Sequence, residues 1–479
     1  MQRPFVFLCF SLSMTFVSSI SLARGLGEKL MPSDSGGTES ILIVRLSDGQ
    51  SIYESNSKKP LVPASVTKVL TSAAMLHYFR PATTLKTKFF TTGSRSGGTV
   101  DGPLYVRGDG DPMLVSEKLW QMAADLKNMG IKSFDGDLII DNSLFDSEER
   151  DSSRADRANA SDRAYDAPVT AFGINFNTLP IVIAPGFKSG DAARVSFDPY
   201  PLPGVGIRNK ATTDGGNENH LSAMRSTTGG DSSITVNGSI GAQNSPAKVY
   251  RSMGDPLAEN GEQLRAFLLN EGISVKGRVR SGKVPGNAKL LYTIDSYDIA
   301  YIVRGLNQFS NNYIADSLVK RLGALQADEA PGSGSLAGGV KAIDEFLRKE
   351  VGIKDRFEIH NGSGLDHRNN FSAEQIVKVL LYMQKRMDLF PEYLASFPAS
   401  GWTGTLKKRF KGADVLDGMV RAKTGTLTQP VAVSSIAGYM GHPKHGMLAF
   451  AILNNSKTTT VAEFRKRQDT ALRKIWEEL

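Results

Sequence analysis

The stretch SILIVRL at residues 40–46 decides the fold, because a buried strand of this kind must pair with other strands. A turn at residues 47–50 and a returning strand from Ser51 to Tyr53 predict a β-hairpin. Three more strands are predicted near the C-terminus, at residues 419–426, 431–440 and 447–453. We therefore expect one antiparallel sheet to which both ends of the chain contribute.

Two helices accompany these strands, because apolar residues recur at helical spacing from Ser65 to Phe79 and from Val461 to Leu479. The fold class is therefore α/β of the α+β kind. The second helix also has a basic face. We expect it to pack on the sheet with this face in solvent, and contact with a membrane surface is the alternative. The basic residues of this helix are Arg465, Lys466, Arg467, Arg473 and Lys474.

The residue composition and pattern between the two ends of the chain differ from those of the ends. A chain of 479 residues is also too long for one compact core. Residues 84–185 mix short strands with a helix at 116–129. Residues 186–245 are rich in Gly, Ser, Asn and Thr, and a helical pattern returns at 255–272. These segments predict insertions within the first domain rather than a series of separate domains.

The first 23 residues predict a secretory signal peptide, because Arg3 precedes an apolar run from Pro4 to Leu22 and a small residue, Ala23, at the cleavage site. The single cysteine, Cys9, lies inside this segment, so the mature protein has no thiol for disulfides, catalysis or metal binding. We expect an exported protein of the periplasm or cell envelope, without firm evidence of a membrane anchor.

Charge and histidine spacing exclude several classes of function. The formal net charge is +8, but Lys and Arg are scattered and not interleaved with aromatics, so we expect no nucleic-acid partner. The six histidines lack metal-ligand spacing, and the acidic residues at 109–141 lack the spacing of an EF-hand loop. We expect neither a metal ion nor another cofactor.

The motif Ser-x-x-Lys places a hydroxyl and an amine one helical turn apart, where a neutral lysine can take the serine proton. Only Ser65 of the four copies stands at the start of an apolar helix, where free N–H groups can stabilise an oxyanion. An N-capping serine with a surface lysine is the alternative. The four copies are Ser55/Lys58, Ser65/Lys68, Ser245/Lys248 and Ser317/Lys320.

Two further motifs follow in the chain. Ser310-Asn311-Asn312 lies between two helical patterns, and Lys423-Thr424-Gly425 lies on a predicted strand, where glycine permits close approach of a ligand or another backbone. Each is weak alone. In the order Ser-x-x-Lys, Ser-x-Asn, Lys-Thr-Gly they match the motif set of penicillin-binding proteins and serine β-lactamases.

The chain resembles one branch of that group, the class C low-molecular-mass penicillin-binding proteins of the penicillin-binding protein 4 type, which are D-alanyl-D-alanine carboxypeptidases and endopeptidases. This branch has a long insertion between its first two motifs, as this chain does between Ser65 and Ser310. Other segments that resemble it are GDGDP at 108–112, IDNSLF at 140–145, SNNYIAD at 310–316, NGSGL at 361–365 and GWTGTL at 401–406.

The resemblance implies a transpeptidase-like catalytic domain with an antiparallel five-stranded sheet flanked by helices, interrupted by two inserted, mainly β domains. The expected division is a signal peptide at 1–23, the catalytic domain at 24–83 and 290–479, a second domain at 84–185 and 246–289, and a β-rich third domain at 186–245.

The resemblance also implies roles for residues that match the motifs. Ser65 would form the acyl-enzyme, with Lys68 as its general base. Ser310 would relay a proton to the leaving D-alanine, and Asn312 would hold Lys68 and the substrate amide. Lys423 would bind the substrate carboxylate and, as a nearby cation, help to keep Lys68 neutral.

Further positions would contact the substrate. Thr424, Gly425 and Thr426 would bind it, and the backbone N–H groups of Ser65 and Thr426 would form the oxyanion hole. The third residue of the peptide would meet Asp141, Phe145 and Arg368. A solvated turn is the alternative for Asp141. The arginine is displaced by one position from the family pattern, and the segment 426–435 is about two residues longer, so specificity at this pocket stays open.

The expected partners are therefore peptidoglycan stem peptides and cross-links, with β-lactam antibiotics as covalent inhibitors. Two alternatives remain. A serine β-lactamase shares the chemistry, although no Glu-x-x-Leu-Asn segment supplies the class A deacylation base. A binding module that senses wall fragments without turnover is the other, although Ser65 and Lys68 are both present.

Overall fold

The computed structural model describes residues 37–478 except 152, 154–160, 229–230 and 413. The predicted signal peptide at 1–23 lies outside the described residues. Among the described residues, no helix combines the length and the apolar character that crossing a membrane requires.

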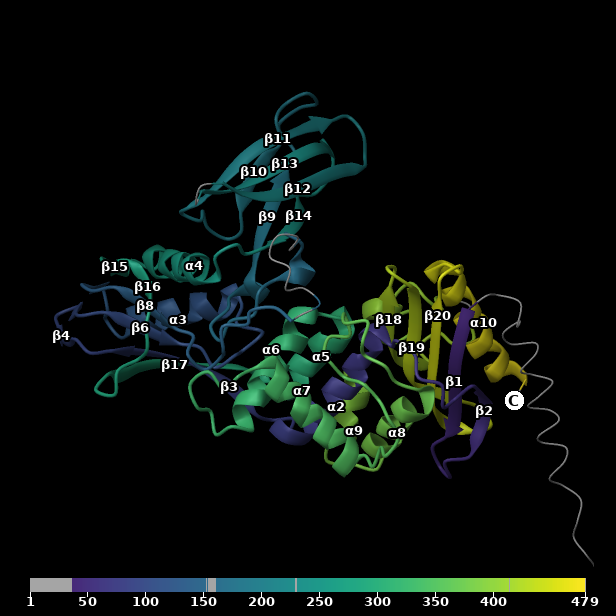
Figure 1. Ribbon diagram of the computed structural model, residues 1–479. Coiled ribbons are helices and arrows are strands. Elements are labelled where there is room, and N and C mark those ends of the chain that lie inside the picture. The colour runs from purple at the N-terminus through teal and green to yellow at the C-terminus, as the bar shows by residue number, and fades with distance from the viewer. Residues whose placement is uncertain (1–36, 152, 154–160, 229–230, 413, 479) are drawn as a thin grey trace, which may run out of the picture.

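Both ends of the chain build the central sheet, which confirms the prediction from the hairpin and the C-terminal strands (Figure 1). Its order is β18-β19-β20-β1-β2, and every neighbouring pair is antiparallel. In the middle, Ile43 of β1 pairs with Phe450 of β20. The strands are β1 (Gly37–Arg45), β2 (Ser51–Ser55), β18 (Val420–Leu427), β19 (Ala432–His442) and β20 (Gly446–Ser456).

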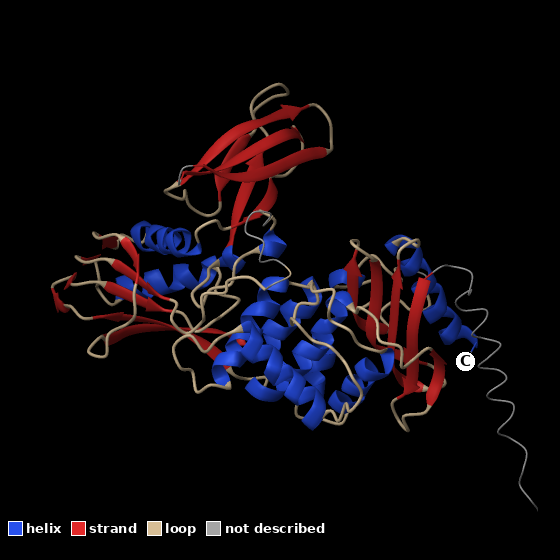
Figure 2. Cartoon of the chain, viewed as in Figure 1, coloured by secondary structure: helices blue, strands red, loops and turns tan. Residues whose placement is uncertain are grey.

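Both faces of this sheet are covered, which explains why SILIVRL is apolar at consecutive positions. Leu42 and Val44 join the core under one group of helices, while Ile41 and Ile43 face the opposite core. Figure 2 shows this group on one side of the sheet and α10 (Val461–Glu478) on the other. The group comprises α2 (Thr67–Phe79), α5 (Ile299–Phe309), α6 (Asn312–Leu325), α7 (Leu336–Glu345), α8 (Ala373–Gln384) and α9 (Phe390–Ser396).

The first inserted region follows α2 and packs two sheets against α3 (Ser116–Asn128) and α4 (Pro256–Asn270). One sheet has the order β16-β8-β6-β3-β17, and the other has the order β15-β7-β5-β4. Its strands are β3 (Thr84–Thr91), β4 (Ser94–Ser96), β5 (Thr99–Asp101), β6 (Leu104–Arg107), β7 (Ser133–Phe134), β8 (Leu138–Asp141), β15 (Ser274–Val275), β16 (Val279–Ser281) and β17 (Lys289–Asp298).

The second inserted region is all β in its described residues and has its own core around Ile181, Ile234 and Val236. Its sheets have the orders β10-β9-β14 and β11-β13-β12. The strands are β9 (Thr178–Ala184), β10 (Arg194–Phe197), β11 (Val205–Asp214), β12 (Asn219–Thr228), β13 (Asp231–Gly241) and β14 (Ala247–Ser252).

Strand pairing places two segments differently from the division expected above. β17 pairs with β3, so residues 289–298 belong to the inserted sheet and the chain returns to the helical group at α5. β9 and β14 pair with each other, so residues 178–184 and 247–252 carry the β-rich region. A boundary in a sequence follows composition, whereas long-range pairing decides which sheet a strand joins.

The loop after β8 joins the first insertion to α6. Phe145 is buried in a small apolar cluster with Tyr313 of α6. The fully buried Lys320 of α6 donates to Asp146 Oδ1 at 2.6 Å and lies 5.2 Å from the Phe145 ring centroid.

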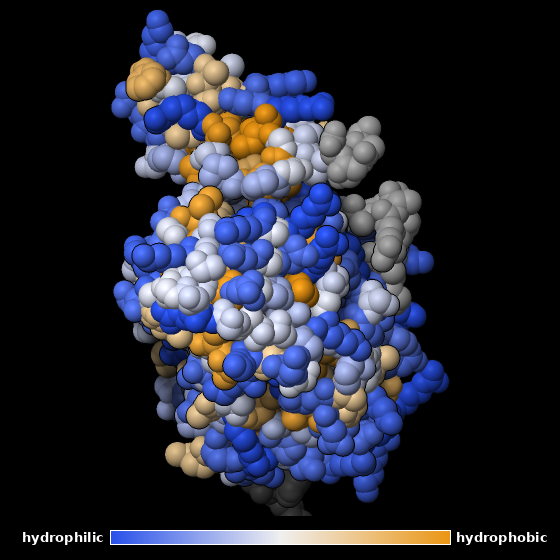
Figure 3. All heavy atoms as spheres, turned by 90° about the vertical axis from the view of Figure 1, so that its left-hand side faces the viewer, coloured by the Kyte–Doolittle hydropathy of each residue, from blue (hydrophilic) through white to orange (hydrophobic). Residues whose placement is uncertain are grey.

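The face of the molecule in Figure 3 is mainly hydrophilic, with apolar residues only in separate patches.

Candidate active site

Ser65 lies in a single 3₁₀ turn, Ala64–Val66, and α2 begins only at Thr67. The helix predicted from Ser65 is therefore shorter at its start by this turn. Ala64 adopts a positive φ of 48°, a sparsely populated conformation that the surrounding packing must hold. In this arrangement Ser65 Oγ lies 3.1 Å from Nζ of Lys68, in the first turn of α2.

The Lys68 amine is completely buried, and its hydrogen-bond partners include oxygen atoms of three residues. Besides Ser65 Oγ, it donates to Asn312 Oδ1 at 2.8 Å and to the carbonyl oxygen of Ser363. Asn312 and Ser363 can each accept one N–H of a neutral amine, and these two bonds direct the nitrogen lone pair towards the Ser65 hydroxyl. The geometry therefore suits proton transfer from Ser65 to Lys68.

The Ser363 carbonyl is a contact that the sequence analysis missed. The loop at 361–364 lies against the start of α2, where Thr71 Oγ1 donates to Gly362 O at 2.8 Å. A Cβ on Gly364, which has a φ of 80°, would lie 2.0 Å from the carbonyl oxygen of Ala64. Glycine is required at this close approach. The NGSGL segment could be recognised in the sequence. Its contact with Lys68 is made by a backbone carbonyl, which every residue has, so the sequence could not indicate this role.

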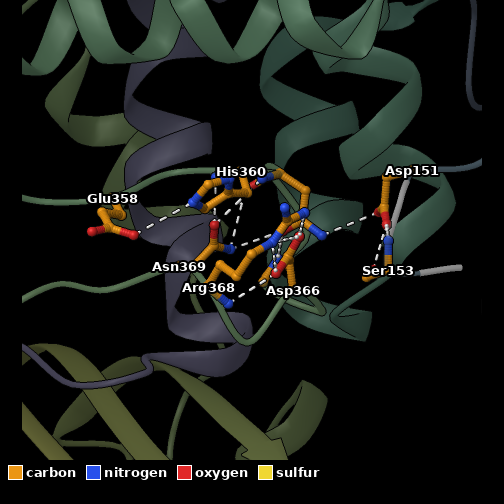
Figure 4. Close-up of polar contacts among 9 residues, drawn as sticks. Asp151, Ser153, Glu358, His360, Asp366, Arg368 and Asn369 are labelled. Atoms are coloured by element: carbon orange, nitrogen blue, oxygen red, sulfur yellow. Dashed lines mark hydrogen bonds and ion pairs between the residues drawn. The ribbon is translucent and has the colours of Figure 1, made fainter.

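Figure 4 shows the polar contacts that hold this loop. Asn361 accepts from Gly364 N at 3.0 Å through Oδ1 and donates to Asp151 Oδ2 at 3.1 Å. Asp151 belongs to the first inserted region, so that region reaches the loop that carries Ser363. Arg368 does not join the serine and lysine groups. It donates to both carboxylate oxygens of Asp366, at 3.0 and 3.1 Å.

Lys423 of β18 is also fully buried and donates to Ser310 Oγ and to the carbonyl oxygen of Thr424, each at 2.7 Å. Burial, and then the positive charge of Lys68, lower the pKa of Lys423 well below its usual value. Ser310 has a left-handed φ of 54° at the junction of α5 and α6, where Asn311 caps α6. The junction thus turns the Ser310 hydroxyl towards β18.

β18 approaches Ser65 closely at Gly425. A Cβ there would lie 2.5 Å from Pro63 O and 3.0 Å from Ser65 N, so a side chain would force the strand away. On either side of this glycine, Thr424 Oγ1 bonds to Thr405 Oγ1 at 2.9 Å, and Thr426 Oγ1 accepts from Arg465 at 2.9 Å. Ser65, Ser310, Thr424 and Thr426 line one open groove of about 820 Å³.

Asp141 and Phe145 lie outside the lining of the groove that contains Ser65. Asp141 ends β8 and is buried, and its carboxylate accepts from the backbone N–H groups of Ser143 at 3.0 Å and Val284 at 2.8 Å. It faces a polar cavity of about 490 Å³, which it shares with Arg321 of α6. The lining of that cavity does not include Ser65. Phe145 packs at the junction with α6, as described above.

The side chains that could bind a metal ion are a separate feature of the structure. Within the described residues, no group of three or more His, Cys, Asp or Glu side chains is arranged to hold a metal ion. The reactive groups that the site brings together are two serine hydroxyls and two buried lysines.

A serine bonded to a buried lysine, beside a strand carrying Lys-Thr-Gly, defines the class of serine acyl-transfer enzymes that recognise penicillin. Residues 26–475 match the model of the D-Ala-D-Ala carboxypeptidase 3 (S13) family. The chain therefore belongs to this family and is a peptidoglycan-acting hydrolase, as expected from the three motifs. Peptidoglycan lies in the cell envelope, so the enzyme acts there.

Relatives and solved structures agree with this membership. The chain is 31% identical over 441 residues to a D-alanyl-D-alanine carboxypeptidase of Actinomadura sp. (strain R39), covering 88% of this chain and 79% of the relative. The crystal structure of penicillin-binding protein 4 (dacB) from Haemophilus influenzae superposes with a TM-score of 0.76 and 25% identity, covering 95% of this chain and 98% of that one. A second structure of that protein, complexed with a β-lactam, gives a TM-score of 0.72 at 23% identity, covering 95% and 98%.

Proposed function

We propose that the chain is a serine D-alanyl-D-alanine carboxypeptidase that cleaves peptidoglycan stem peptides through an acyl-enzyme on Ser65. The observation that carries this proposal is the pairing of Ser65 Oγ with Lys68 Nζ at 3.1 Å, within a groove that also holds Ser310 and Thr424. We further propose that residues 1–23 direct export to the periplasm.

The first step forms the acyl-enzyme. Lys68 takes the hydroxyl proton of Ser65, and Oγ attacks the carbonyl carbon of the penultimate D-alanine. The backbone N–H groups of Ser65 and Thr426 lie on two segments that Gly425 brings together, and they stabilise the oxyanion. The close packing of Gly425 against Ser65 N supports this pairing.

The second step breaks the peptide bond. The C–N bond cleaves while Ser310 Oγ gives its proton to the leaving D-alanine nitrogen and takes up the proton that Lys68 received from Ser65, so Lys68 is neutral again. Since Ser310 Oγ accepts a hydrogen bond from Lys423, its own proton is free to point into the groove. Water then attacks the acyl-enzyme, with Lys68 again as base, and releases the shortened peptide. Asn312 holds Lys68 throughout.

The direct test is a pentapeptide that ends in D-alanyl-D-alanine. Incubation with the protein is expected to release free D-alanine, and pre-incubation with penicillin is expected to stop this release. Rapid, continuous turnover of nitrocefin with no release of D-alanine would instead assign a β-lactamase. If neither the peptide nor nitrocefin is turned over while penicillin still acylates Ser65, the protein is a binding module.

Lys423 supplies the positive charge for the substrate carboxylate, acting beside Ser310 and Thr424, because a bound carboxylate and a neutral Lys68 oppose the two effects that lower the pKa of Lys423. Since hydrogen bonds to charged groups contribute about 1.5–3 kcal/mol, Lys423→Ala is expected to lower kcat/KM for the free-acid peptide roughly 10- to 100-fold. The same peptide with an amidated C-terminus lacks the carboxylate, so the substitution is expected to slow its hydrolysis much less. Equal losses for the acid and the amide would exclude Lys423 as the carboxylate anchor.

Asp141 is our proposed contact for the side-chain amine of a diamino acid at the third position of the peptide, with Phe145 and Arg368 as further contributors. Its place on a polar cavity supports this role. Asp141 itself is buried, but its partner amine would lie in the open cavity, and an ion pair that solvent reaches in this way contributes ~0.2–1 kcal/mol. Asp141→Asn is therefore expected to slow hydrolysis of a free-amine pentapeptide by a few-fold. A peptide with that amine acetylated serves as control. Identical losses for both peptides would show that Asp141 supports only the backbone of Ser143 and Val284.

A further inference from the structure

The carbonyl group of Ser363, which accepts a hydrogen bond from Lys68, is not fixed by the Ser363 side chain. That side chain is completely buried, and its hydroxyl has no hydrogen-bond partner among the described residues. The next residue, Gly364, has a positive φ of 80°. Because glycine tolerates both signs of φ, the peptide unit between Ser363 and Gly364 could rotate at little steric cost and turn the carbonyl away from Lys68.

Asn361 holds this peptide unit at its N–H group. A trans peptide unit is planar, so its N–H and its C=O point in opposite directions. Gly364 N donates to Asn361 Oδ1 at 3.0 Å, and this bond directs the Ser363 carbonyl to the opposite side, where Lys68 lies. The orientation of the Lys68 amine therefore depends on the orientation of the Asn361 side chain.

The side-chain amide of Asn361 has two ends of similar shape, an oxygen that accepts and a nitrogen that donates. An ionised carboxylate only accepts hydrogen bonds. Asp151 Oδ2 therefore takes the Asn361 nitrogen, at 3.1 Å, and leaves the oxygen for Gly364 N. Asn369 supports the same orientation, because its amide nitrogen donates to Asn361 Oδ1 at 2.8 Å.

Asp151 is itself held in place. It is buried, and it also accepts from the backbone N–H of Ser153 at 2.8 Å and from the Ser153 hydroxyl (Figure 4). A buried carboxylate is costly unless hydrogen bonds compensate for the lost water, so these contacts keep Asp151 beside Asn361. The loop that carries Asp151 is also attached to α6, where Lys320 donates to Asp146.

We propose that Asp151 is a positioning residue for Lys68 and that it acts through Asn361. This inference rests on the function proposed above, in which Lys68 is the base. The first inserted region thereby holds the base in line with the nucleophile. Without Asp151, the Asn361 amide loses a fixed partner, the Ser363 carbonyl is free to turn, and the lone pair of the amine is no longer directed at the hydroxyl. A misplacement of about 1 Å can slow a reaction by about 10²-fold.

The first test follows the reaction of fluorescent penicillin with Asp151→Ala. Stopped-flow measurements separate the dissociation constant of the complex before acylation from the rate constant of acylation. We expect the rate constant to fall about tenfold, because the base is misplaced. We expect the dissociation constant to stay close to that of the wild type, because Asp151 lies outside the lining of the groove. Partial unfolding would instead lower the amplitude and leave the rate constant unchanged, and that result would overturn the proposal.

A second test exchanges the donor and the acceptor. In Asn361→Asp two carboxylates face each other, and we expect acylation to slow about tenfold. Adding Asp151→Asn returns a donor to the pair, because the amide nitrogen at position 151 can donate to the carboxylate at position 361. The amide oxygen at position 151 still accepts from Ser153 N. We expect the double variant to recover the acylation rate constant to within threefold of the wild type, since the two positions are coupled.

Asp146→Asn is the matched control, because Asp146 lies on the same loop but its carboxylate accepts from Lys320 of α6. We expect this variant to lower the temperature of thermal unfolding and to keep the wild-type rate constant of acylation. A slowing equal to that of Asp151→Ala would show a general disturbance of the loop and would contradict the positioning role.

The outcomes separate this inference from the function on which it rests. If penicillin acylates the wild type at Ser65 and the Asp151→Ala rate constant equals that of the wild type, only the positioning role is wrong. If penicillin does not acylate the wild type at all, the proposed acyl-transfer mechanism fails as well. If Asn361→Asp stays slow after Asp151→Asn is added, Asn361 acts without Asp151, and the inference is refuted.

Discussion

Replacing Ser65 with alanine is expected to abolish covalent labelling by fluorescent penicillin while leaving the protein folded. Ser65 Oγ is bonded to Lys68 Nζ, and in the mechanism that we propose no acyl-enzyme forms without this hydroxyl. Ser65 is only partly buried, and the contacts of Gly425 and Gly364 with this turn involve backbone atoms, so truncation at Cβ preserves the packing. Mass spectrometry of the wild type after incubation with penicillin is expected to find one adduct, on the peptide that contains Ser65.

The other Ser-x-x-Lys copies provide controls for this experiment. Ser245 lies in an exposed turn of the β-rich region, and Ser245→Ala is expected to label as the wild type does. Circular dichroism and thermal unfolding of Ser65→Ala check that the fold persists. Persistent labelling of a folded Ser65→Ala protein would refute the assignment of the nucleophile.

Replacing Lys68 with alanine is expected to slow acylation by both the peptide and penicillin, roughly 10²- to 10⁴-fold, because a positioned base contributes rate enhancement of this size. Proton removal from Ser65 is common to the two reactions, whereas the role that we propose for Lys423 is recognition of the carboxylate. The measurement is the rate constant of penicillin acylation, followed by fluorescence, together with D-alanine release from the pentapeptide.

Lys68 is buried with acceptors on several sides, so its removal also leaves Asn312 Oδ1 and the Ser363 carbonyl without this donor. A second variant, Asn312→Ala, separates positioning from proton transfer. Asn312→Ala keeps the Lys68 amine but removes one of its hydrogen-bond acceptors, so we expect a smaller loss of acylation rate than in Lys68→Ala. The exposed Lys58 belongs to a chance copy of the motif, and Lys58→Ala serves as control. An acylation rate of Lys68→Ala within threefold of the wild type would exclude Lys68 as the base.

Short motifs predicted some residues of the site, whereas other contacts of the site could not be predicted from motifs. The pairs Ser65/Lys68 and Lys423/Thr424 are each local in sequence, so their types and spacing were visible. The contact of Lys68 with Ser363 joins residues 295 positions apart and ends on a backbone carbonyl. The contact of Asn361 with Asp151 spans 210 positions. Neither follows from periodicity or composition.

Local pattern was sufficient for the elements of the central domain. Runs of apolar residues predicted the strands at both ends of the chain, and helical spacing predicted α2 and α10, because burial on one or two faces leaves a pattern in the sequence. The order of three short motifs was sufficient for the reaction class, since the chemistry demands those residue types.

Tertiary structure alone decided the rest. It assigned β17 to the inserted sheet, placed the basic face of α10 along the groove of Ser65, and directed the Asp141 carboxylate to two backbone N–H groups. A basic helical face has the same sequence whether it meets solvent, a membrane or a ligand. Its surroundings depend on how distant segments pack, and distant packing leaves no periodic signal along the chain.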